Sequence, residues 1–249
     1  MEDLSNRQVL ELVEGFRRLR RGALMSIISV AMVFASFAIL FFLAIGSAFP
    51  MRYPPTYYPG QIPQTFGAGI AAMGVTVLAV MLVALILTII AFILWFMATG
   101  NLKRYNPERF GIGRLGMVLQ LIGIILIVVG GVAGLALIGF AASAGLMAAP
   151  SAFGAFFGFL AILILAAILA IIGAILFAIM FIRFPEDARI ESGFKTAGIL
   201  YLIGVILSII PFVSMVGSII VLVAVILIFI YSGSTLRRLE ALPETQPKG

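Results

Sequence analysis

The sequence of 249 residues contains no cysteine and no histidine. Without these side chains the protein cannot form disulfides, offer a thiolate nucleophile, hold haem through imidazole or build the usual zinc and copper sites. These absences exclude most membrane redox subunits, and we expect no metal and no cofactor. The lack of cysteine leaves the redox compartment open.

Charge is nearly as scarce. Only 10% of the residues are charged and 63% are hydrophobic, whereas soluble domains are roughly a quarter charged and half apolar. A water-soluble protein is therefore excluded, and membrane lipids are the expected surroundings. The net charge of +6 has to be interpreted by its position relative to the membrane, so we predict no nucleic-acid partner.

No charged residue lies within the long apolar stretches. Ion-coupled transporters and proton relays usually carry a charged group inside the membrane, and a serine-type intramembrane protease needs a base beside its nucleophile. We therefore expect no enzyme activity. An enzyme would have to use acids of the polar segments whose spacing matches no known motif: Glu108, Glu186, Asp187 and Glu191.

The apolar stretches predict an all-α bundle of transmembrane helices, because backbone groups in lipid must be bonded within the protein. The region 196–234 is too long for one span, and Pro211 and Gly217 bracket a turn that divides it. The first apolar run is too long for a cleavable signal and predicts an uncleaved anchor. The first four predicted spans, which precede this divided region, lie at about 23–49, 67–98, 115–142 and 153–182.

Six spans would form three hairpins and would place every lysine and arginine except Arg52 on one side of the membrane. By the positive-inside rule this is the cytoplasmic side of the cell membrane, with both termini inside. The predicted parts are a lead-in, three hairpins and a tail: 1–22, 23–99, 100–182, 183–236 and 237–249.

Two segments leave alternatives open. Residues 1–22 have the apolar spacing of a short amphipathic helix, which binds the membrane surface or a partner, or simply leads into the first span. Residues 50–66 hold five prolines interleaved with three tyrosines and predict an extended external loop. This loop is either a docking strap for another protein or an interfacial loop with tyrosines at the headgroups.

Two glycine pairs have the GxxxG spacing that lets membrane helices approach closely, Gly130 with Gly134 and Gly154 with Gly158. We expect internal packing, with self-association as the alternative. Gln120 is the most polar side chain within a span, and we expect it to form an interhelical hydrogen bond rather than to line a solute path. Milder polar residues are Ser26, Ser29, Thr76, Thr88 and Ser208.

Residues 111–116 read GIGRLG, a literal match to the dinucleotide fingerprint. No strand precedes the match, so nucleotide binding is not expected. Exposed amides near Arg109 and Arg114 could instead hold an anionic lipid headgroup.

The junction RLGMVLQLIGIIL (114–126) recurs as KTAGILYLIGVIL (195–207). Together with EGFRRLRRGALMSIIS (14–29) and the flanking RFGIG and SIIPFVSMVG, these stretches resemble an archaeal family of uncharacterised multi-pass membrane proteins, known only as a domain of unknown function. The resemblance implies an archaeal integral membrane protein and supplies no activity or site residue.

The expected function is that of a non-catalytic structural or accessory subunit of a membrane assembly, with membrane-protein partners or as a homo-oligomer. The alternative is a small-solute transporter or lipid-handling permease that uses uncharged groups such as Gln120. A helix broken at Pro211 would suit such a transporter.

Overall fold

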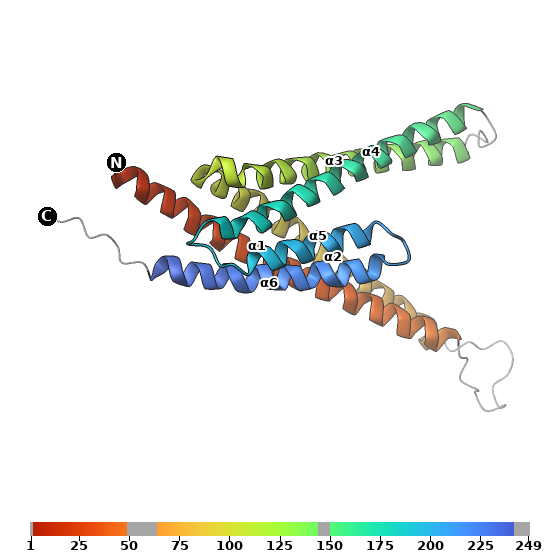
Figure 1. Cartoon of the computed structure of the whole chain (residues 1–249). Helices are drawn as coiled ribbons and strands as arrows, with labels where there is room; N and C mark the ends of the chain where they lie inside the picture. Colours follow the sequence, from red (N-terminus) through yellow and green to blue (C-terminus); the bar gives the residue numbers. More distant parts are fainter. Residues whose placement is uncertain (1, 49–63, 144–149, 242–249) are drawn as a thin grey trace.

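A computed structural model describes residues 2–48, 64–143 and 150–241, and this part of the chain is helical without any strand (Figure 1), which confirms the all-α prediction. The predicted Pro- and Tyr-rich loop lies mostly outside the described residues. The helices are α1 (Glu2–Ala48), α2 (Gln64–Tyr105), α3 (Pro107–Ser143), α4 (Pro150–Arg183), the short 3₁₀ helix η2 (Phe184–Glu186), α5 (Phe194–Ser208) and α6 (Ser214–Glu240).

Helix α1 joins the predicted lead-in and the first span into one helix of 47 residues. Its apolar stripe, with Leu12, Phe16 and Leu19 fully buried, packs on the protein's own core. The stripe therefore serves the fold and is not free to bind a membrane surface or a partner.

Helices α2 and α3 are separated by a single residue, Asn106. Proline at 107 disfavours helical geometry in the residue before it and suits the first position of the new helix. The Asn106 side chain accepts a hydrogen bond from the Arg109 backbone N–H at 3.1 Å and so caps α3. Residues 111–116, predicted to lie just before a span, are therefore inside α3.

Five of the described helices, α1, α2, α3, α4 and α6, are long and apolar enough to cross a membrane. The break between α5 and α6 confirms that the last apolar region is divided, with the turn at residues 209–213. Helix α5 has only 15 residues, fewer than the roughly 20 that a span needs. The structure thus identifies five helices of spanning length where the sequence predicted six.

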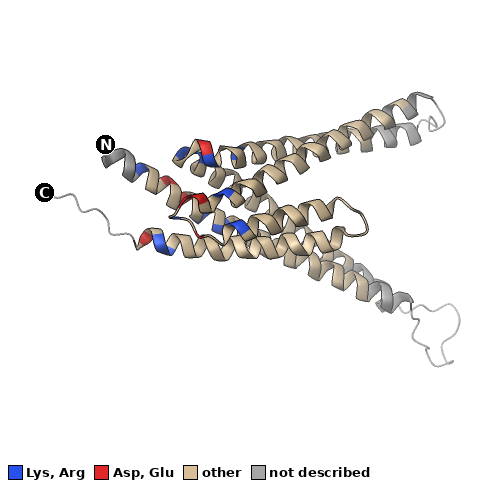
Figure 2. Ribbon diagram, viewed as in Figure 1, with Lys and Arg blue, Asp and Glu red and all other residues tan. Residues whose placement is uncertain are grey.

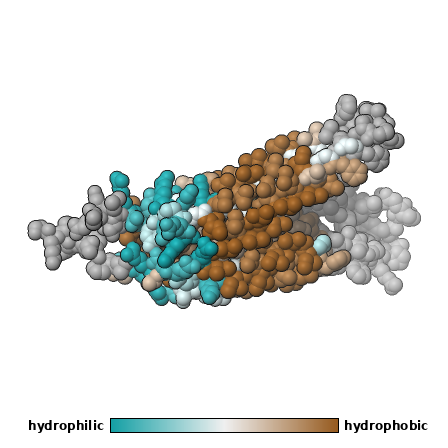
Figure 3. Space-filling view, turned by 45° about the horizontal axis from the view of Figure 1, so that its top comes forward, coloured by the Kyte–Doolittle hydropathy of each residue, from teal (hydrophilic) through white to brown (hydrophobic). Residues whose placement is uncertain are grey.

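The helices form three antiparallel hairpins, α1–α2, α3–α4 and α5–α6, which meet at one end and diverge toward the other (Figure 1). Contacts between hairpins join α1 to α6, α2 to α3 and α4 to α5. The described lysines and arginines gather where the hairpins meet (Figure 2), and we call this the charged end. Beyond it, the face of the described residues that Figure 3 shows is almost wholly apolar.

An aromatic core lies at the charged end and joins all three hairpins. The ring centroid of Phe184 in η2 is 4.9 Å from that of Phe194, 5.2 Å from that of Phe110 and 5.5 Å from that of Phe16. All four side chains are fully buried. Edge-to-face pairs of this kind are favourable beyond the area that they bury. The hairpins are therefore held together chiefly at this end.

Glycines bring the two helices of a hairpin into close contact. A Cβ atom on Gly116 would lie 2.6 Å from the Gly173 carbonyl oxygen, and one on Gly123 would lie 2.8 Å from the Ala166 oxygen. In α5 and α6, a Cβ on Gly204 would lie 2.9 Å from the Gly217 oxygen. Gly204 and Gly123 are equivalent in the sequence repeat, and both face the second helix of their own hairpin.

Candidate functional site

The charged end is the first candidate, because it holds nearly all the ionisable groups of the described residues. Ion pairs join its elements: Arg17 to Glu240 at 3.6 Å, Arg104 to Glu11 at 3.5 Å and Arg238 to Glu191 at 2.7 Å. At least one partner in each pair is largely exposed, so each pair adds little to stability. These pairs align the hairpin ends, and the surplus of cations gives this end a positive surface.

A polar hollow of about 420 Å³ lies at the charged end, between the α2–α3 turn and the α4–α5 connection. The Tyr105 hydroxyl donates to an Asp187 carboxylate oxygen at 2.5 Å, and the Arg109 guanidinium donates to the Glu186 carbonyl at 2.8 Å. Both bonds connect the α2–α3 turn to the segment after α4. The hollow is thus lined by groups that are used to hold the fold.

The predicted headgroup pair, Arg109 and Arg114, is not brought together. Arg109 is directed to Glu186, whereas Arg114 lies over the Phe96 ring, 3.4 Å from its centroid, and donates to the Phe96 carbonyl. Helix α3 already includes residues 111–116, so most of the amides expected to be free are inside a helix. The joint headgroup site therefore stays a prediction, and each of the two arginines already donates to a different backbone carbonyl.

Gln120 lies in the seam between α3 and α4. A Cβ atom on Gly173 would be 2.7 Å from the Gln120 Cγ, so the stem of the side chain packs directly on that glycine. The amide nitrogen is buried and has no hydrogen-bond partner in the described part of the chain. This nitrogen therefore does not make the interhelical bond expected of Gln120. Such a bond is found in the first hairpin, where the Ser29 hydroxyl lies 2.7 Å from both the Thr88 hydroxyl and the Ala84 carbonyl.

The two predicted glycine pairs differ. Gly130 and Gly134 face α4: added Cβ atoms would lie 3.1 Å from Ile162 and 2.5 Å from Phe159. Gly154 and Gly158 are exposed, and a Cβ atom on either would meet no described atom within 4 Å. Internal packing thus accounts for the first pair, and the second pair remains open on the surface of α4.

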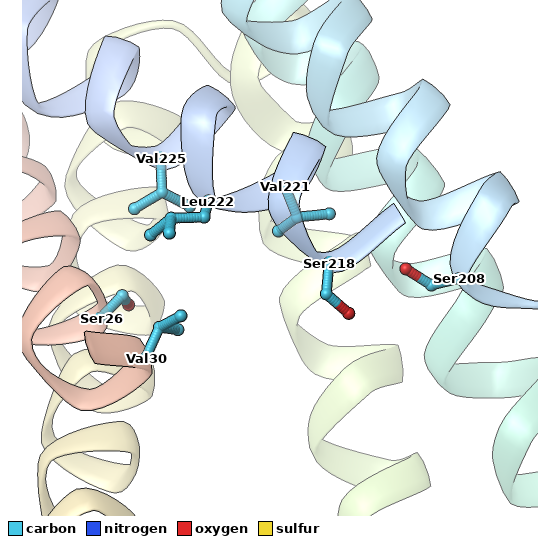
Figure 4. A pocket seen from close by; sticks show the side chains of 7 residues that line it. All are labelled: Ser26, Val30, Ser208, Ser218, Val221, Leu222 and Val225. Carbon is cyan, nitrogen blue, oxygen red and sulfur yellow. The ribbon is translucent and has the colours of Figure 1, made fainter. Parts of the chain in front are cut away.

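An apolar crevice of about 250 Å³ lies between α1 and part of the α5–α6 hairpin (Figure 4). Two of its serines are bonded within their own helices, Ser208 to the Gly204 carbonyl and Ser218 to the Ser214 carbonyl. The crevice depends on α1 lying beside α6, a neighbour relation that no sequence pattern revealed. Its lining residues are Ser26, Val30, Ser208, Ser218, Val221, Leu222 and Val225.

No group of three acidic side chains within residues 2–48, 64–143 and 150–241 is placed to hold a metal ion. The family model for a protein of unknown function (DUF973) matches residues 12–248. This match confirms the expected resemblance to a family of unknown function. No curated protein and no solved structure matches the chain.

Proposed function

We propose, from the premise that this chain belongs to the DUF973 family of proteins of unknown function, that it is a non-catalytic accessory protein of the cell membrane. Its charged end lies at the cytoplasmic surface, and the exposed face of α4 binds a transmembrane helix of another chain. The membrane location follows from its five long apolar helices.

The orientation is supported by the position of the cations. Helix α1 begins and α6 ends at the charged end, where the described lysines and arginines gather (Figure 2). Cytoplasmic segments of membrane proteins carry an excess of these residues. Both termini are therefore assigned to the cytoplasm.

The observation that carries the accessory role is the open pair of Gly154 and Gly158. Helix association in lipid depends on close backbone approach, since apolar burial gives no driving force there. The α3–α4 hairpin buries Gly116, Gly123 and Gly130 for this purpose, but this pair has no described neighbour within 4 Å. The pair lies near the start of α4, and α4 starts at the divergent end, where α3 and α4 have left the other helices (Figure 1).

The polar groups argue against a transport path. The charged side chains of the described residues lie at one end (Figure 2), and the buried Gln120 amide nitrogen is enclosed at a helix seam. A solute would meet an aromatic core between the hairpins at that end. A role in binding other membrane proteins needs none of these groups to move.

The test is co-purification after mild extraction. We expect the wild-type protein to carry a second membrane chain, or a second copy of itself, and the Gly154→Leu/Gly158→Leu double variant to lose it while keeping its thermal stability. Gly74→Leu is the matched control, because Gly74 is also exposed and a Cβ atom there meets nothing within 4 Å. A wild-type protein that is monomeric and without partners would contradict the proposal.

The second candidate, a lipid-handling permease, is favoured by one observation, the crevice between α1 and α6 (Figure 4). A crevice that is apolar apart from three serines suits a lipid tail better than a hydrophilic solute. Transfer of fluorescent lipid between the leaflets of proteoliposomes, abolished by Val225→Phe, would replace the accessory role with this one.

A further inference from the structure

The α5–α6 hairpin is much shorter than the other two. Helix α5 has 15 residues, which at 1.5 Å per residue is about 22 Å, against about 30 Å of hydrocarbon in a bilayer. Helices α3 and α4 have 37 and 34 residues. In Figure 1 the α5–α6 hairpin turns back before the far end of the α3–α4 hairpin is reached.

Helix α6 is longer than α5 chiefly because it continues into the charged end. The Thr235 hydroxyl accepts a hydrogen bond from the Glu191 backbone N–H at 3.3 Å, and the Ser234 hydroxyl donates to the Glu191 carboxylate at 3.1 Å. One turn earlier, Tyr231 packs against Gly193, just before α5. Tyr231 of α6 is thus level with the start of α5, and at the other end Gly217 lies against Ser208, the last residue of α5. Only the first turn of α6, residues 214–216, and the connecting turn extend beyond α5.

The turn between α5 and α6 has the composition of a lipid-facing segment. It reads Ile-Ile-Pro-Phe-Val over residues 209–213, and no charged residue occurs between Lys195 and Arg237. The side chain of Phe212 is 99% exposed and that of Met215 is 67% exposed. Turns in water are dominated by Gly, Asn, Asp, Ser and Pro, and of these only Pro211 occurs within this turn.

The backbone of the turn is largely bonded within the hairpin. The N–H groups of Ile209 and Ile210 donate to the carbonyls of Ile206 and Leu207, both at 3.2 Å, and the Val213 N–H donates to the Ile210 carbonyl at 3.0 Å. Pro211 has no N–H group. Its carbonyl accepts from the Ser214 hydroxyl at 2.9 Å. Each of these bonds removes a backbone group that would be costly to leave unpaired in hydrocarbon.

We infer that the α5–α6 hairpin is re-entrant: it enters the membrane from the charged end, turns within the hydrocarbon, and returns to the same side. Acyl chains of the opposite leaflet cover Phe212 and continue beneath the turn. The chain then crosses the bilayer four times, through α1 to α4. A re-entrant hairpin returns the chain to the side from which it entered, just as two full spans would. The cations before and after the hairpin therefore remain on the same side of the membrane.

The inference does not depend on the accessory role, since a monomeric protein could carry the same hairpin. The inference also names lipid acyl chains as occupants of the crevice in Figure 4. Ser208 and Ser218 line that crevice and lie close to the turn in sequence. Acyl chains that surround the turn have direct access to it.

Single cysteines in the naturally cysteine-free protein provide the test. Phe212→Cys would be reconstituted in nanodiscs, where both membrane faces meet water, and treated with a water-soluble maleimide. The matched controls are Leu165→Cys, at an exposed position midway along α4, and Ala188→Cys, at an exposed position of the charged end.

We expect Phe212→Cys to react as slowly as Leu165→Cys and at least about tenfold more slowly than Ala188→Cys, because maleimide reacts with the thiolate, which apolar surroundings disfavour. A rate equal to that of Ala188→Cys would overturn the inference, since the turn would then reach water on the far side. Met215→Cys repeats the test if Phe212→Cys does not fold. A nitroxide attached to either cysteine should collide more often with oxygen than with a water-soluble nickel chelate, and the reverse preference would also overturn the inference.

Discussion

At the scale of single residues, the glycines of the hairpin seams determine how closely the helices pack. Gly116 and Gly131 belong to the same helix and have opposite surroundings. A Cβ atom on Gly116 would lie 2.6 Å from a backbone oxygen of α4, whereas one on Gly131 would meet nothing within 4 Å. The same added methyl group therefore has opposite consequences at the two positions.

We predict that Gly116→Ala lowers the free energy of unfolding by about 1–3 kcal/mol, because the added methyl group overpacks a backbone contact. Gly131→Ala, with open space around it, should be neutral or raise the free energy by up to about 1 kcal/mol through helix propensity. Denaturant titration of both variants in one detergent measures the difference. Equal effects at the two positions would contradict the close α3–α4 approach.

The sequence predicted that Gly130 and Gln120 lie at helix contacts, but it did not predict which helix each of them contacts. A GxxxG spacing marks a face that can approach another helix, and nothing in the spacing says whether that helix belongs to the same chain. Gly154 and Gly158 have the same spacing as Gly130 and Gly134, yet only the latter pair faces the other helix of its own hairpin among the described residues. Likewise, Arg109 and Arg114 are close in sequence, but they turn to different partners.

At the scale of elements, the 3₁₀ helix η2 joins the bundle. Its Phe184 contacts aromatic rings from α1, α3, α4 and α5. The sequence predicted the long helices and the division near Pro211, because apolar length and proline are local signals. It missed the continuity of α1 and the role of Phe184, because both depend on contacts between distant segments.

We predict that Phe184→Ala lowers the free energy of unfolding by about 3–5 kcal/mol, the usual cost of removing a fully buried aromatic ring. The loss should loosen the hairpins from one another, so limited proteolysis should cut the α4–α5 connection faster. Phe212→Ala is the control, since that ring is 99% exposed, and it should leave both measurements nearly unchanged. If Phe184→Ala left the free energy of unfolding and the rate of proteolysis unchanged, the aromatic core would not be what joins the hairpins.

At the scale of the whole molecule, one end carries the charge and the aromatic core, and three apolar hairpins extend from it (Figures 2 and 3). The division of charge was predictable from the sequence, because the cations recur after each pair of apolar stretches. The divergence of the hairpins was not predictable from the sequence. The membrane-spanning parts of the helices are almost equally apolar on all sides, so their composition does not indicate the angle between one hairpin and the next. The small-residue seams and the core together determine it.

The most direct test of the account is the side of the membrane on which the charged end lies. Single cysteines at Arg7, Ala188 and Ala241 would mark the start of α1, the α4–α5 connection and the end of α6. We predict that an impermeant maleimide labels none of them in intact cells and all three after permeabilisation. Labelling of one from outside while another stays protected would contradict the common cytoplasmic end.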